Sequence, residues 1–261
     1  MDFSGKVALV TGGGQHIGLT TARLLASLGA AVAINDVRAE RAQAAADGLA
    51  AEGKRAIAVP ADVRDRAAVT AMVERTVGTL GRLDVVVNSA GEGSFAPVLE
   101  MDEAAWDLEL DTNLKGTFLV CQAAARAMVA QGHGGAIVCL ASTAAESARM
   151  NGVSHCASKA GVVMVVKVMA LELGQYGIRV NAVAPGLVPG PEQGSTAEYQ
   201  NAFLQMIPLD RLGRADDIAR AIAYLASDDA AWVTGEVLHV DGGFLAGRPL
   251  PRNMPAASST R

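Results

Sequence analysis

Short apolar runs alternate with amphipathic stretches along most of the chain. The apolar runs are rich in β-branched residues, a composition typical of strands that are buried on both faces of a parallel sheet. They lie at residues 6–11, 31–36, 56–60, 83–88, 136–140 and 179–183. Helices are predicted between them at residues 15–28, 39–52, 66–79, 103–131 and 152–174. This alternation predicts right-handed βαβ units, and therefore an α/β fold with a doubly wound parallel sheet.

No shift in composition and no linker interrupts the chain before residue 245, so we expect one domain over residues 1–245. Residues 186–213 form a long irregular stretch that contains Pro189 and Pro191, and loops of that length are commonly functional. We expect a lid over a substrate site there. Residues 246–261 are rich in Pro, Ser and Ala, and we expect a tail that is loosely held or lies on a neighbouring subunit.

The composition argues against several classes of function. About half of the 261 residues (51%) are apolar, enough for a sizeable core, and the net charge of −5 argues against nucleic acid as a partner. No apolar run is long enough to span a membrane, and residues 1–6 lack the form of a signal peptide. The three cysteines lie in apolar contexts without a CxxC pair, as expected of buried reduced thiols in a cytoplasmic protein. The four histidines show no metal-ligand spacing, so we expect no metal.

Residues 151–161 contain the polar side chains that most suggest chemistry. His155 and Lys159 are four residues apart, so they project from one face of the predicted helix. Ser142 lies at the end of the preceding apolar run. A hydroxyl at a strand end that faces an imidazole and an ammonium can form a proton-transfer centre. Taken alone, the same pattern also fits a structural histidine and lysine at the start of a helix.

A glycine cluster at residues 12–14 separates the first predicted strand from the first helix. Such a turn brings backbone N–H groups and a helix N-terminus up to a pyrophosphate, although many α/β proteins contain one. Asp36 ends the second strand, where a carboxylate accepts hydrogen bonds from an adenosine ribose and repels a 2′-phosphate. Arg38 is a counter-signal, since an arginine there can accommodate that phosphate. We predict NAD in preference to NADP.

Several short motifs occur in a fixed order along the chain. They are residues 11–18, Asp62-Val63, residues 88–91, Asn113, Ser142, Lys159, Pro185-Gly186 and residues 240–243. In this order and spacing the chain resembles the classical short-chain dehydrogenase/reductase family over residues 3–244. The resemblance implies a single Rossmann-type domain with helices on both faces of the sheet, and nicotinamide-dependent exchange between a secondary alcohol and a ketone. It also implies a homo-oligomer, a dimer or a homotetramer, formed through the helices at 103–131 and 152–174.

The resemblance further implies which residues contact the cofactor. In and after the glycine turn these are Gly12, Gly14, Gln15, His16, Ile17 and Gly18. Asp62 and Val63 would lie near the adenine. The residues that would line the cofactor are Asn88, Ala90 and Gly91, and those that would flank the nicotinamide are Pro185, Gly186 and Val188.

Two residues depart from the family pattern. His16 occupies the middle glycine of the motif Thr-Gly-x-x-x-Gly-x-Gly, where a side chain must point away from the pyrophosphate or bond to it. Gly13 and Gly14 would then supply the close backbone approach. His155 occupies the tyrosine position of the family's Tyr-x-x-x-Lys motif. Ser142 lies thirteen residues before His155, the spacing that the family shows between its catalytic serine and tyrosine, so an error of register does not explain the substitution.

Four residues are catalytic candidates. In the family, a tyrosine exchanges a proton with the substrate oxygen while hydride moves at the nicotinamide. A lysine lowers the tyrosine pKa and holds the nicotinamide ribose, a serine orients the substrate oxygen, and an asparagine supports a water relay. The resemblance assigns these last three roles to Lys159, Ser142 and Asn113. Histidine is a competent acid/base group near neutral pH, so His155 is the fourth candidate.

Three functions are consistent with this sequence. The first is an NAD-dependent oxidoreductase that acts on a small or medium secondary alcohol or ketone, with His155 in place of tyrosine. The second is a non-redox acid/base enzyme on the same fold, which would catalyse elimination or carbon–carbon cleavage. The third is a catalytically silent NAD-binding partner. The three retained family residues argue against this possibility. Glu146 and Arg149 could contact a polar substrate, although charged loop residues are usually only solvated.

Overall fold

The computed structural model describes residues 1–190 and 196–247, so most of the expected tail and part of the expected lid lie outside the described residues. Within them, seven strands form one parallel sheet in the order β3-β2-β1-β4-β5-β6-β7. Their bounds are β1 Val7–Thr11, β2 Ala31–Ile34, β3 Ala56–Ala58, β4 Val85–Asn88, β5 Gly135–Leu140, β6 Ile178–Pro185 and β7 Val237–Val240. Strand β1 pairs with both β2 and β4, which confirms the predicted doubly wound α/β fold.

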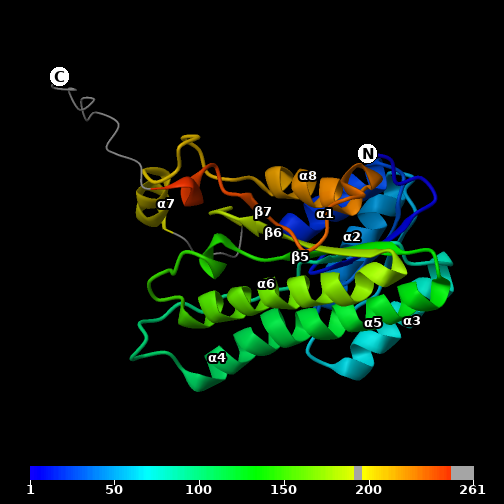
Figure 1. The fold of residues 1–261 in the computed structure, drawn as a ribbon, viewed down its shortest axis with the longest axis horizontal. Helices are drawn as coiled ribbons and strands as arrows, with labels where there is room; N and C mark the ends of the chain where they lie inside the picture. The colour runs from blue at the N-terminus through cyan, green and yellow to red at the C-terminus, as the bar shows by residue number, and fades with distance from the viewer. Residues whose placement is uncertain (191–195, 248–261) are drawn as a thin grey trace.

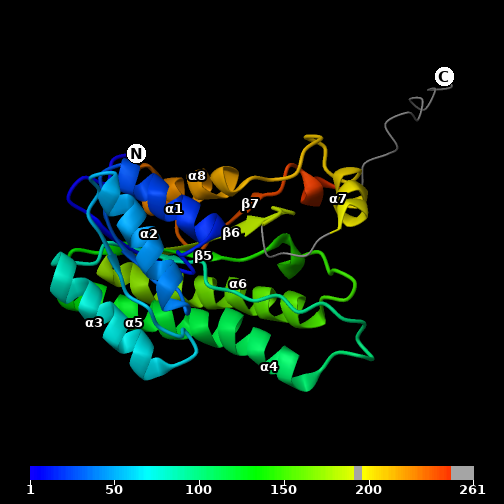
Figure 2. The same cartoon turned by 180° about the vertical axis from the view of Figure 1, so that it is seen from behind.

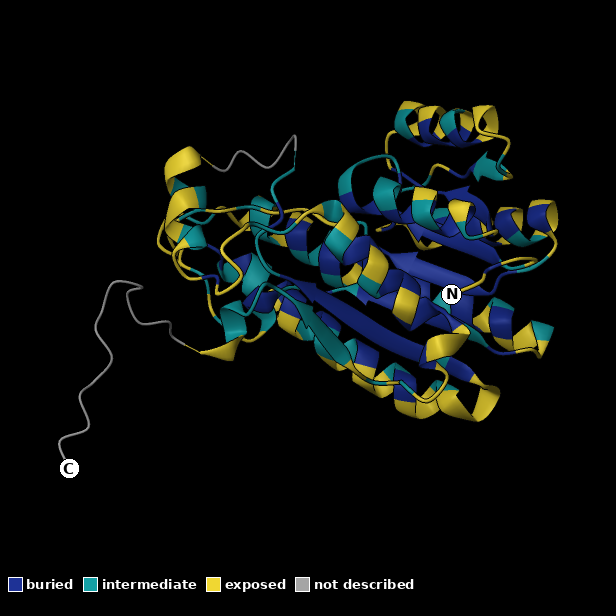
Figure 3. Ribbon diagram, turned by 90° about the horizontal axis from the view of Figure 1, so that it is seen from above, coloured by how far each residue is buried: buried dark blue, intermediate teal, exposed yellow. Residues whose placement is uncertain are grey.

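Helices cover both faces of the sheet (Figures 1 and 2). One layer contains α1 (His16–Ser27), α2 (Ala39–Ala51) and α8 (Ala215–Ala226). The opposite layer contains α3 (Arg66–Leu80), α4 (Glu103–Leu110), α5 (Gly116–Gln131) and α6 (Val153–Leu173). Helix α8 packs against α1, so a late segment of the chain closes on an early one. Most of the strand surface is buried between the two layers (Figure 3), and one apolar cluster fills each face of the sheet.

Helix α4 continues into α5 through a π-helical turn at Asp111–Lys115. The sequence predicted one helix over residues 103–131, and the structure confirms helix there but adds this turn, which accommodates one extra residue. Asn113 lies in the turn and is fully buried. Its side-chain amide accepts from the Glu92 N–H at 2.8 Å and donates to the Glu92 carbonyl at 3.0 Å. The turn therefore fixes Asn113 against the loop that follows β4.

The expected lid is not wholly irregular. Helix α7 (Ala197–Leu204) lies within it, and the Thr196 hydroxyl caps the helix by accepting the N–H of Tyr199 at 3.2 Å. The prediction of an irregular stretch is wrong here because the prolines that suggested it precede Thr196, whereas residues 197–204 have ordinary helix-forming side chains. Helix α8 and strand β7, which were not predicted, follow this segment.

Two expectations from composition concern the cysteines and membranes. Cys121 and Cys139 are buried as predicted, but the prediction is wrong for Cys156, which is only partly buried. Cys156 lies beneath the exposed loop before α6, where its sulfur accepts the main-chain N–H of Arg149 at 3.3 Å. In the described part of the chain, every helix is too short or too polar to cross a membrane.

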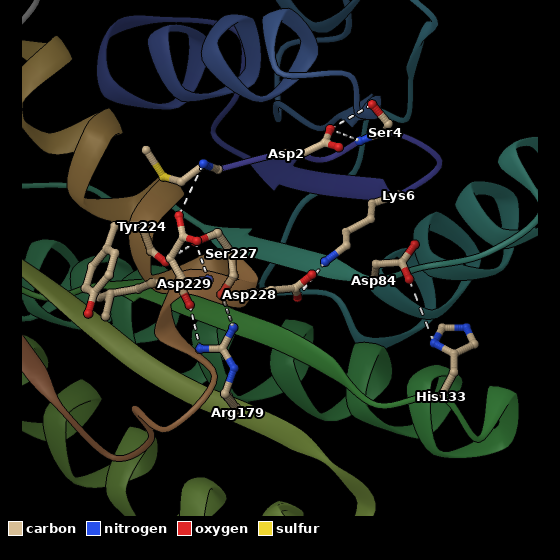
Figure 4. A network of polar contacts seen from close by, with 12 residues as sticks. Asp2, Ser4, Lys6, Asp84, His133, Arg179, Tyr224, Ser227, Asp228 and Asp229 are labelled. Carbon is tan, nitrogen blue, oxygen red and sulfur yellow. Dashed lines mark hydrogen bonds and ion pairs between the residues drawn. The ribbon is translucent and has the colours of Figure 1, made fainter.

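The amino ends of the strands carry a network of polar contacts (Figure 4). Lys6, just before β1, forms an ion pair with Asp228 at 2.7 Å. Arg179 of β6 donates to the main-chain oxygens of Leu225 and Ser227 at 2.7 and 2.9 Å. These contacts attach the end of α8 and the turn after it to the start of the sheet.

Helices α5 and α6 leave an apolar face exposed. The large apolar side chains on it are Phe118, Val129, Met164, Val168, Leu171 and Tyr176. A shallow groove of about 390 Å³ runs between the two helices, lined by Phe118, Val129 and Met169 among others. The predicted homo-oligomer would cover this face, and its formation stays a prediction.

Candidate active site

The carboxyl ends of β1, β4, β5 and β6 meet at one edge of the sheet, where ligands bind in doubly wound folds. Thr11 at the end of β1 pairs in register with Asn88 at the end of β4, and its hydroxyl donates to the Asn88 side chain at 2.9 Å. Ser142 follows β5, and the first half of α6 carries His155 and Lys159. Helix α6 packs on the short turn after Ser142, so the structure places these predicted residues in one region.

His155 is hydrogen-bonded to a buried carboxylate. Its Nδ1 lies 2.9 Å from Oε1 of Glu109, a residue of helix α4. The Glu109 side chain is fully buried, and 16% of the His155 side chain is exposed. Oε2 of Glu109 accepts the Ser154 hydroxyl at 2.6 Å and the main-chain N–H of Ser94 at 3.0 Å. Each carboxylate oxygen therefore faces at least one donor.

These donors decide the charge of Glu109 and the tautomer of His155. Burial alone raises the pKa of Glu109, but the hydrogen bonds from His155, Ser154 and the Ser94 N–H outweigh it, so the pKa lies below its ordinary value. An ionised carboxylate only accepts hydrogen bonds, so Nδ1 of His155 carries the proton. The lone pair of the neutral imidazole is then on Nε2, which is the acid/base atom that His155 can present to a substrate.

Lys159 and Asn113 both lie close to Gly91, in the loop after β4. A Cβ atom on Gly91 would lie 3.1 Å from Oδ1 of Asn113 and 3.7 Å from Nζ of Lys159. Nζ donates to the last carbonyl of β5 at 2.8 Å, and burial lowers the pKa of Lys159 to about 8. Asn113 also donates to Glu109 at 3.3 Å, which links it to His155. Hydrogen bonds thus connect Asn113 to His155 through Glu109, and Lys159 lies near Asn113 at Gly91.

Ser142 lies at the edge of this cluster and is bonded elsewhere. Its hydroxyl accepts the N–H of Ala144 at 3.1 Å and caps the short turn after β5. Within the described residues, the Ser142 hydroxyl makes no hydrogen bond with His155. Its contact with a substrate oxygen stays a prediction.

The glycine turn after β1 packs against the ends of two neighbouring strands. Gly12 has a φ of +59°, and a Cβ atom there would lie 2.9 Å from Cα of Ala90, so this position requires glycine. A Cβ atom on Gly14 would lie 2.6 Å from Oδ2 of Asp36, the buried carboxylate after β2. Helix α1 begins next, and in the described structure it has no side-chain cap and no acidic residue in its first turn. Its first N–H groups can therefore bind an anion.

His16 lies in this turn and points to the expected lid. Its φ of +45° is in the left-handed region that favours glycine. Its Nε2 lies 3.1 Å from the main-chain oxygen of Pro189, and a Cβ atom on Gly190 would lie 2.9 Å from its ring. Burial lowers the pKa of His16, so the neutral ring donates to this carbonyl through Nε2–H. The His16 side chain thus joins the glycine turn to the loop after β6.

The other predicted cofactor residues lie along the same edge of the sheet. Asp62 is paired with Arg64 at 2.6 Å, and Val63 is buried. At the start of α1 lie Gln15, Ile17 and Gly18, at the end of β4 lie Asn88 and Ala90, and at and after the end of β6 lie Pro185, Gly186 and Val188. Their contacts with a cofactor stay predictions. A glycine turn, an uncapped helix start and a carboxylate beside both are the features that define a dinucleotide-binding protein of the Rossmann type.

Comparisons with known proteins agree with this fold and site. The family model described as enoyl-(acyl carrier protein) reductase matches residues 13–245. The chain is 42% identical over 247 residues to (2S)-[(R)-hydroxy(phenyl)methyl]succinyl-CoA dehydrogenase subunit BbsD of Thauera aromatica, across 93% of this chain and 98% of that protein. It is 43% identical over 246 residues to cis-4-hydroxycyclohexanecarboxylate dehydrogenase of Sinomonas cyclohexanicum, across 94% and 98%. The structure of a short-chain type dehydrogenase/reductase from Mycobacterium marinum superposes with a TM-score of 0.88 at 37% identity, across 94% and 97%.

The chain therefore belongs to the short-chain dehydrogenase/reductase family, as its motifs predicted. This family uses nicotinamide cofactors, and the residues at the carboxyl edge of the sheet fit such a group. The relatives are dehydrogenases and reductases, so they support a redox enzyme in preference to the non-redox and silent alternatives.

Glu109 is a residue of the candidate site that was not predicted from the sequence. One signal could have found it: Glu109 lies four residues before Asn113, so the predicted helix places the two on one face. That signal gives neither its burial nor its partner. The hydrogen bond to His155 exists because α4 packs against α6, and hydrophobic periodicity does not specify which helices become neighbours.

Proposed function

We propose that the protein is an NAD(H)-dependent oxidoreductase that interconverts a secondary alcohol and a ketone, with His155 as the acid/base group. The observation that carries this proposal is the 2.9 Å contact between Nδ1 of His155 and Oε1 of Glu109. A carboxylate at Nδ1 holds a catalytic imidazole in one tautomer and stabilises the imidazolium that forms when Nε2 takes a proton. A relative named as a hydroxycyclohexanecarboxylate dehydrogenase supports a secondary alcohol as the substrate.

Each catalytic residue has a defined task in this reaction. During alcohol oxidation, Nε2 of His155 takes the hydroxyl proton, and Glu109 stabilises the resulting imidazolium. During ketone reduction, the same atom returns the proton to the substrate oxygen. Ser142 orients that oxygen, and the Lys159 ammonium would hold the nicotinamide ribose. A bound nicotinamide supplies the hydride acceptor for oxidation and the hydride donor for reduction.

Asp36 supports NAD as the cofactor. Its carboxylate is buried beside Gly14, and its Oδ1 accepts the main-chain N–H of Arg38 at 3.0 Å, so its position is fixed. A carboxylate there accepts hydrogen bonds from the ribose hydroxyls and repels a 2′-phosphate. Fluorescence titrations with NADH and NADPH should show tighter binding of NADH, and Asp36→Asn should narrow the difference. Equal affinity of the wild type for both cofactors would contradict this assignment.

The test of the proposed reaction follows nicotinamide absorbance with NAD⁺ or NADH and a panel of secondary alcohols and ketones. Wild type is compared with His155→Phe and His155→Tyr. A positioned proton-transfer group contributes about 10²–10⁴-fold, so we expect His155→Phe to lose that much kcat while it still binds NADH. An unchanged kcat in His155→Phe would contradict the role of His155. Turnover that appears only in His155→Tyr would favour the non-redox alternative.

The exposed apolar face on α5 and α6 supports a homo-oligomer. Leu171 on this face is 84% exposed in the single chain, and such a side chain is stabilised when a second copy covers it. Light scattering should give a mass of two or four times 26.7 kDa for the wild type. Leu171→Asp should shift the mass toward the single chain, whereas a wild type that is monomeric at all concentrations would contradict the proposal.

A further inference from the structure

Arg149 carries a guanidinium group that lies near the site and has no counter-ion among the described residues. Its loop connects the short turn after β5 to α6. The guanidinium carbon lies 4.2 Å from the ring centroid of Phe95 and 4.9 Å from that of Tyr199, on α7. Within the described residues, its side chain makes these ring contacts but no hydrogen bond and no ion pair. Aromatic rings attract a cation but offer no lone pair to the five N–H donors of a guanidinium.

Three other arginines of the chain have acidic counter-ions in the described structure. Arg64, Arg82 and Arg211 are each paired with an aspartate. Arg149 is partly buried, yet the described structure provides no acceptor for its N–H groups. A charged group that is partly removed from water without a partner is costly, and an anionic ligand would remove that cost.

The position of Arg149 relative to His155 is set by Phe95. The Phe95 and His155 ring centroids are 5.7 Å apart. Hydrogen bonds fix the main chain on both sides of Phe95. The Ser94 N–H donates to Glu109 at 3.0 Å, and the Ala96 N–H donates to the Asn151 carbonyl at 2.9 Å. The 4.2 Å and 5.7 Å contacts together place the guanidinium carbon within about 10 Å of the His155 ring centroid.

We infer that Arg149 binds a carboxylate of the substrate, so that the substrates are secondary hydroxy acids and the corresponding keto acids. This inference rests on the proposed function, because His155 marks where the reacting carbon binds. A guanidinium binds a carboxylate through two parallel hydrogen bonds, which adds direction to the attraction of opposite charges. The short distance to His155 leaves room for only a few carbon atoms between the carboxylate and the reacting carbon. The anion therefore belongs to the reacting part of the molecule and not to a distant carrier group.

A binding experiment can test this inference without turnover. A keto acid and NAD⁺ are both oxidised, so the enzyme can bind them together without reacting. Calorimetry would compare 4-oxopentanoate, 5-oxohexanoate and 6-oxoheptanoate with their methyl esters, using the full chain saturated with NAD⁺. The ester keeps the carbon skeleton and the ketone and loses the charge. We expect at least one acid to bind at least about tenfold tighter than its ester.

Three variants show whether Arg149 causes the preference. Arg149→Met should bring the affinities of acid and ester within about twofold of each other, and Arg149→Lys should keep part of the preference, since it keeps the charge without the planar fork. Arg220→Met is the matched control, because Arg220 is exposed on α8, and it should bind as the wild type does. Arg149→Met should fold normally, because its side chain makes no hydrogen bond in the described structure, and thermal melts verify this.

The outcomes separate this inference from the proposed function. Acids that bind no better than esters, acids that do not bind at all, or a preference that survives in Arg149→Met would each overturn the role of Arg149. A preference that Arg149→Met abolishes supports it, whether or not the wild type turns over any compound. If the hydroxy acids bind but are not oxidised with NAD⁺, the proposed function fails while the carboxylate site stands.

Discussion

Two histidine–carboxylate pairs lie at opposite edges of the sheet. At the carboxyl edge, His155 lies 2.9 Å from Glu109, and the Glu109 side chain is fully buried. At the amino edge, His133 lies 3.8 Å from Asp84 (Figure 4), and 34% of the His133 side chain is exposed. The same two kinds of side chain therefore occur in two different environments within one domain.

The other partners of each carboxylate explain the difference. Asp84 accepts hydrogen bonds from Nε of Arg82 at 2.7 Å and from the main-chain N–H of Val7 at 2.9 Å. A permanently charged guanidinium therefore already balances the negative charge of Asp84. In the described structure, Glu109 is instead hydrogen-bonded by a hydroxyl, an amide, a main-chain N–H and His155. Its stabilisation therefore depends on the proton of an imidazole. Of these two carboxylates, Asp84 is balanced by a fixed cation, whereas Glu109 is hydrogen-bonded by an imidazole at the candidate site.

The largest expected effect comes from removing the charge of each carboxylate. Glu109→Gln should lower kcat by about 10²–10⁴-fold, because an amide no longer holds the Nδ1–H tautomer or stabilises the imidazolium. Asp84→Asn should lower the melting temperature and leave kcat within about twofold, because it lies at the other edge of the sheet. Steady-state kinetics and thermal melts of both variants test this. Equal losses of kcat in the two would remove the distinction between the pairs.

Glu109→Gln also tests how the free energy of unfolding depends on pH under acidic conditions. The pKa of Glu109 is lowered, so its ionised form stabilises the fold above its ordinary pKa near 4.5, and this contribution is lost as the pH falls through the lowered value. The wild type should therefore lose its stability relative to Glu109→Gln as the pH falls below about 4.5 and through the lowered pKa. Urea unfolding at several pH values measures this difference, and a constant difference would contradict the lowered pKa.

A comparison of two lysines is expected to give the next largest effect. Burial lowers the pKa of Lys159 from 10.5 to about 8, whereas Lys6 forms an exposed ion pair. Below pH 8 the folded protein carries the full cost of a buried ammonium, and this cost disappears as the pH rises to 10.5. The stability of the cofactor-free wild type relative to Lys159→Met should rise by roughly 3 kcal/mol over that interval. The stability of Lys6→Met relative to Lys159→Met should rise with pH by the same amount as that of the wild type. Urea unfolding of all three proteins between pH 7 and 10.5 measures this rise.

A comparison of backbone strain in turns at the two edges of the sheet is expected to give a smaller effect. Turns at the amino edge, such as those at Gly5 and Gly134, use glycine at positive φ, whereas the carboxyl edge places His16 there. His16→Ala keeps the strain and loses the bond to Pro189, so it should lower the free energy of unfolding by about 1 kcal/mol. His16→Gly loses the same bond but relieves the strain, so it should be about 1 kcal/mol more stable than His16→Ala. Chemical denaturation measures both, and equal stabilities would show that φ at this position carries no strain.

The smallest effect is expected at the surface of the amino edge. Lys6 and Asp228 are 2.7 Å apart, and 83% of the Asp228 side chain is exposed. Exposed ion pairs contribute about 0–1 kcal/mol and are screened by salt. A double-mutant cycle with Lys6→Met and Asp228→Asn should therefore give a coupling below about 1 kcal/mol that falls in 0.5 M salt. A larger coupling that resists salt would mean that the amino-edge network is not a simple surface feature.

Much of the fold was predictable from the sequence because its signals are local. Six of the strands are short β-branched runs bounded by turn residues, and the period of their flanking helices is regular. The region after residue 186 was predicted poorly, since prolines obscured the helical pattern of α7. The π-helical turn at Asp111–Lys115 has no simple signature in the pattern of apolar residues.

The residues of the candidate site also divide into those that were predictable and those that were not. Asn113, Ser142 and Lys159 could be named because they stand in an ordered set of motifs. Glu109 and the orientation of His16 could not, because their partners lie 46 and 173 residues further along the chain. Such contacts depend on which helices and loops become neighbours after folding.

The packing of α8 against α1 has a consequence for how the protein is made. About 190 residues separate the end of α1 at Ser27 from the start of α8 at Ala215. At ribosomal rates of 5–20 residues per second, roughly 10–40 s pass between the synthesis of the two helices. During that interval the apolar face of α1 that α8 will cover stays open to other contacts. Folding of this layer is thus completed only after α8 has been synthesised.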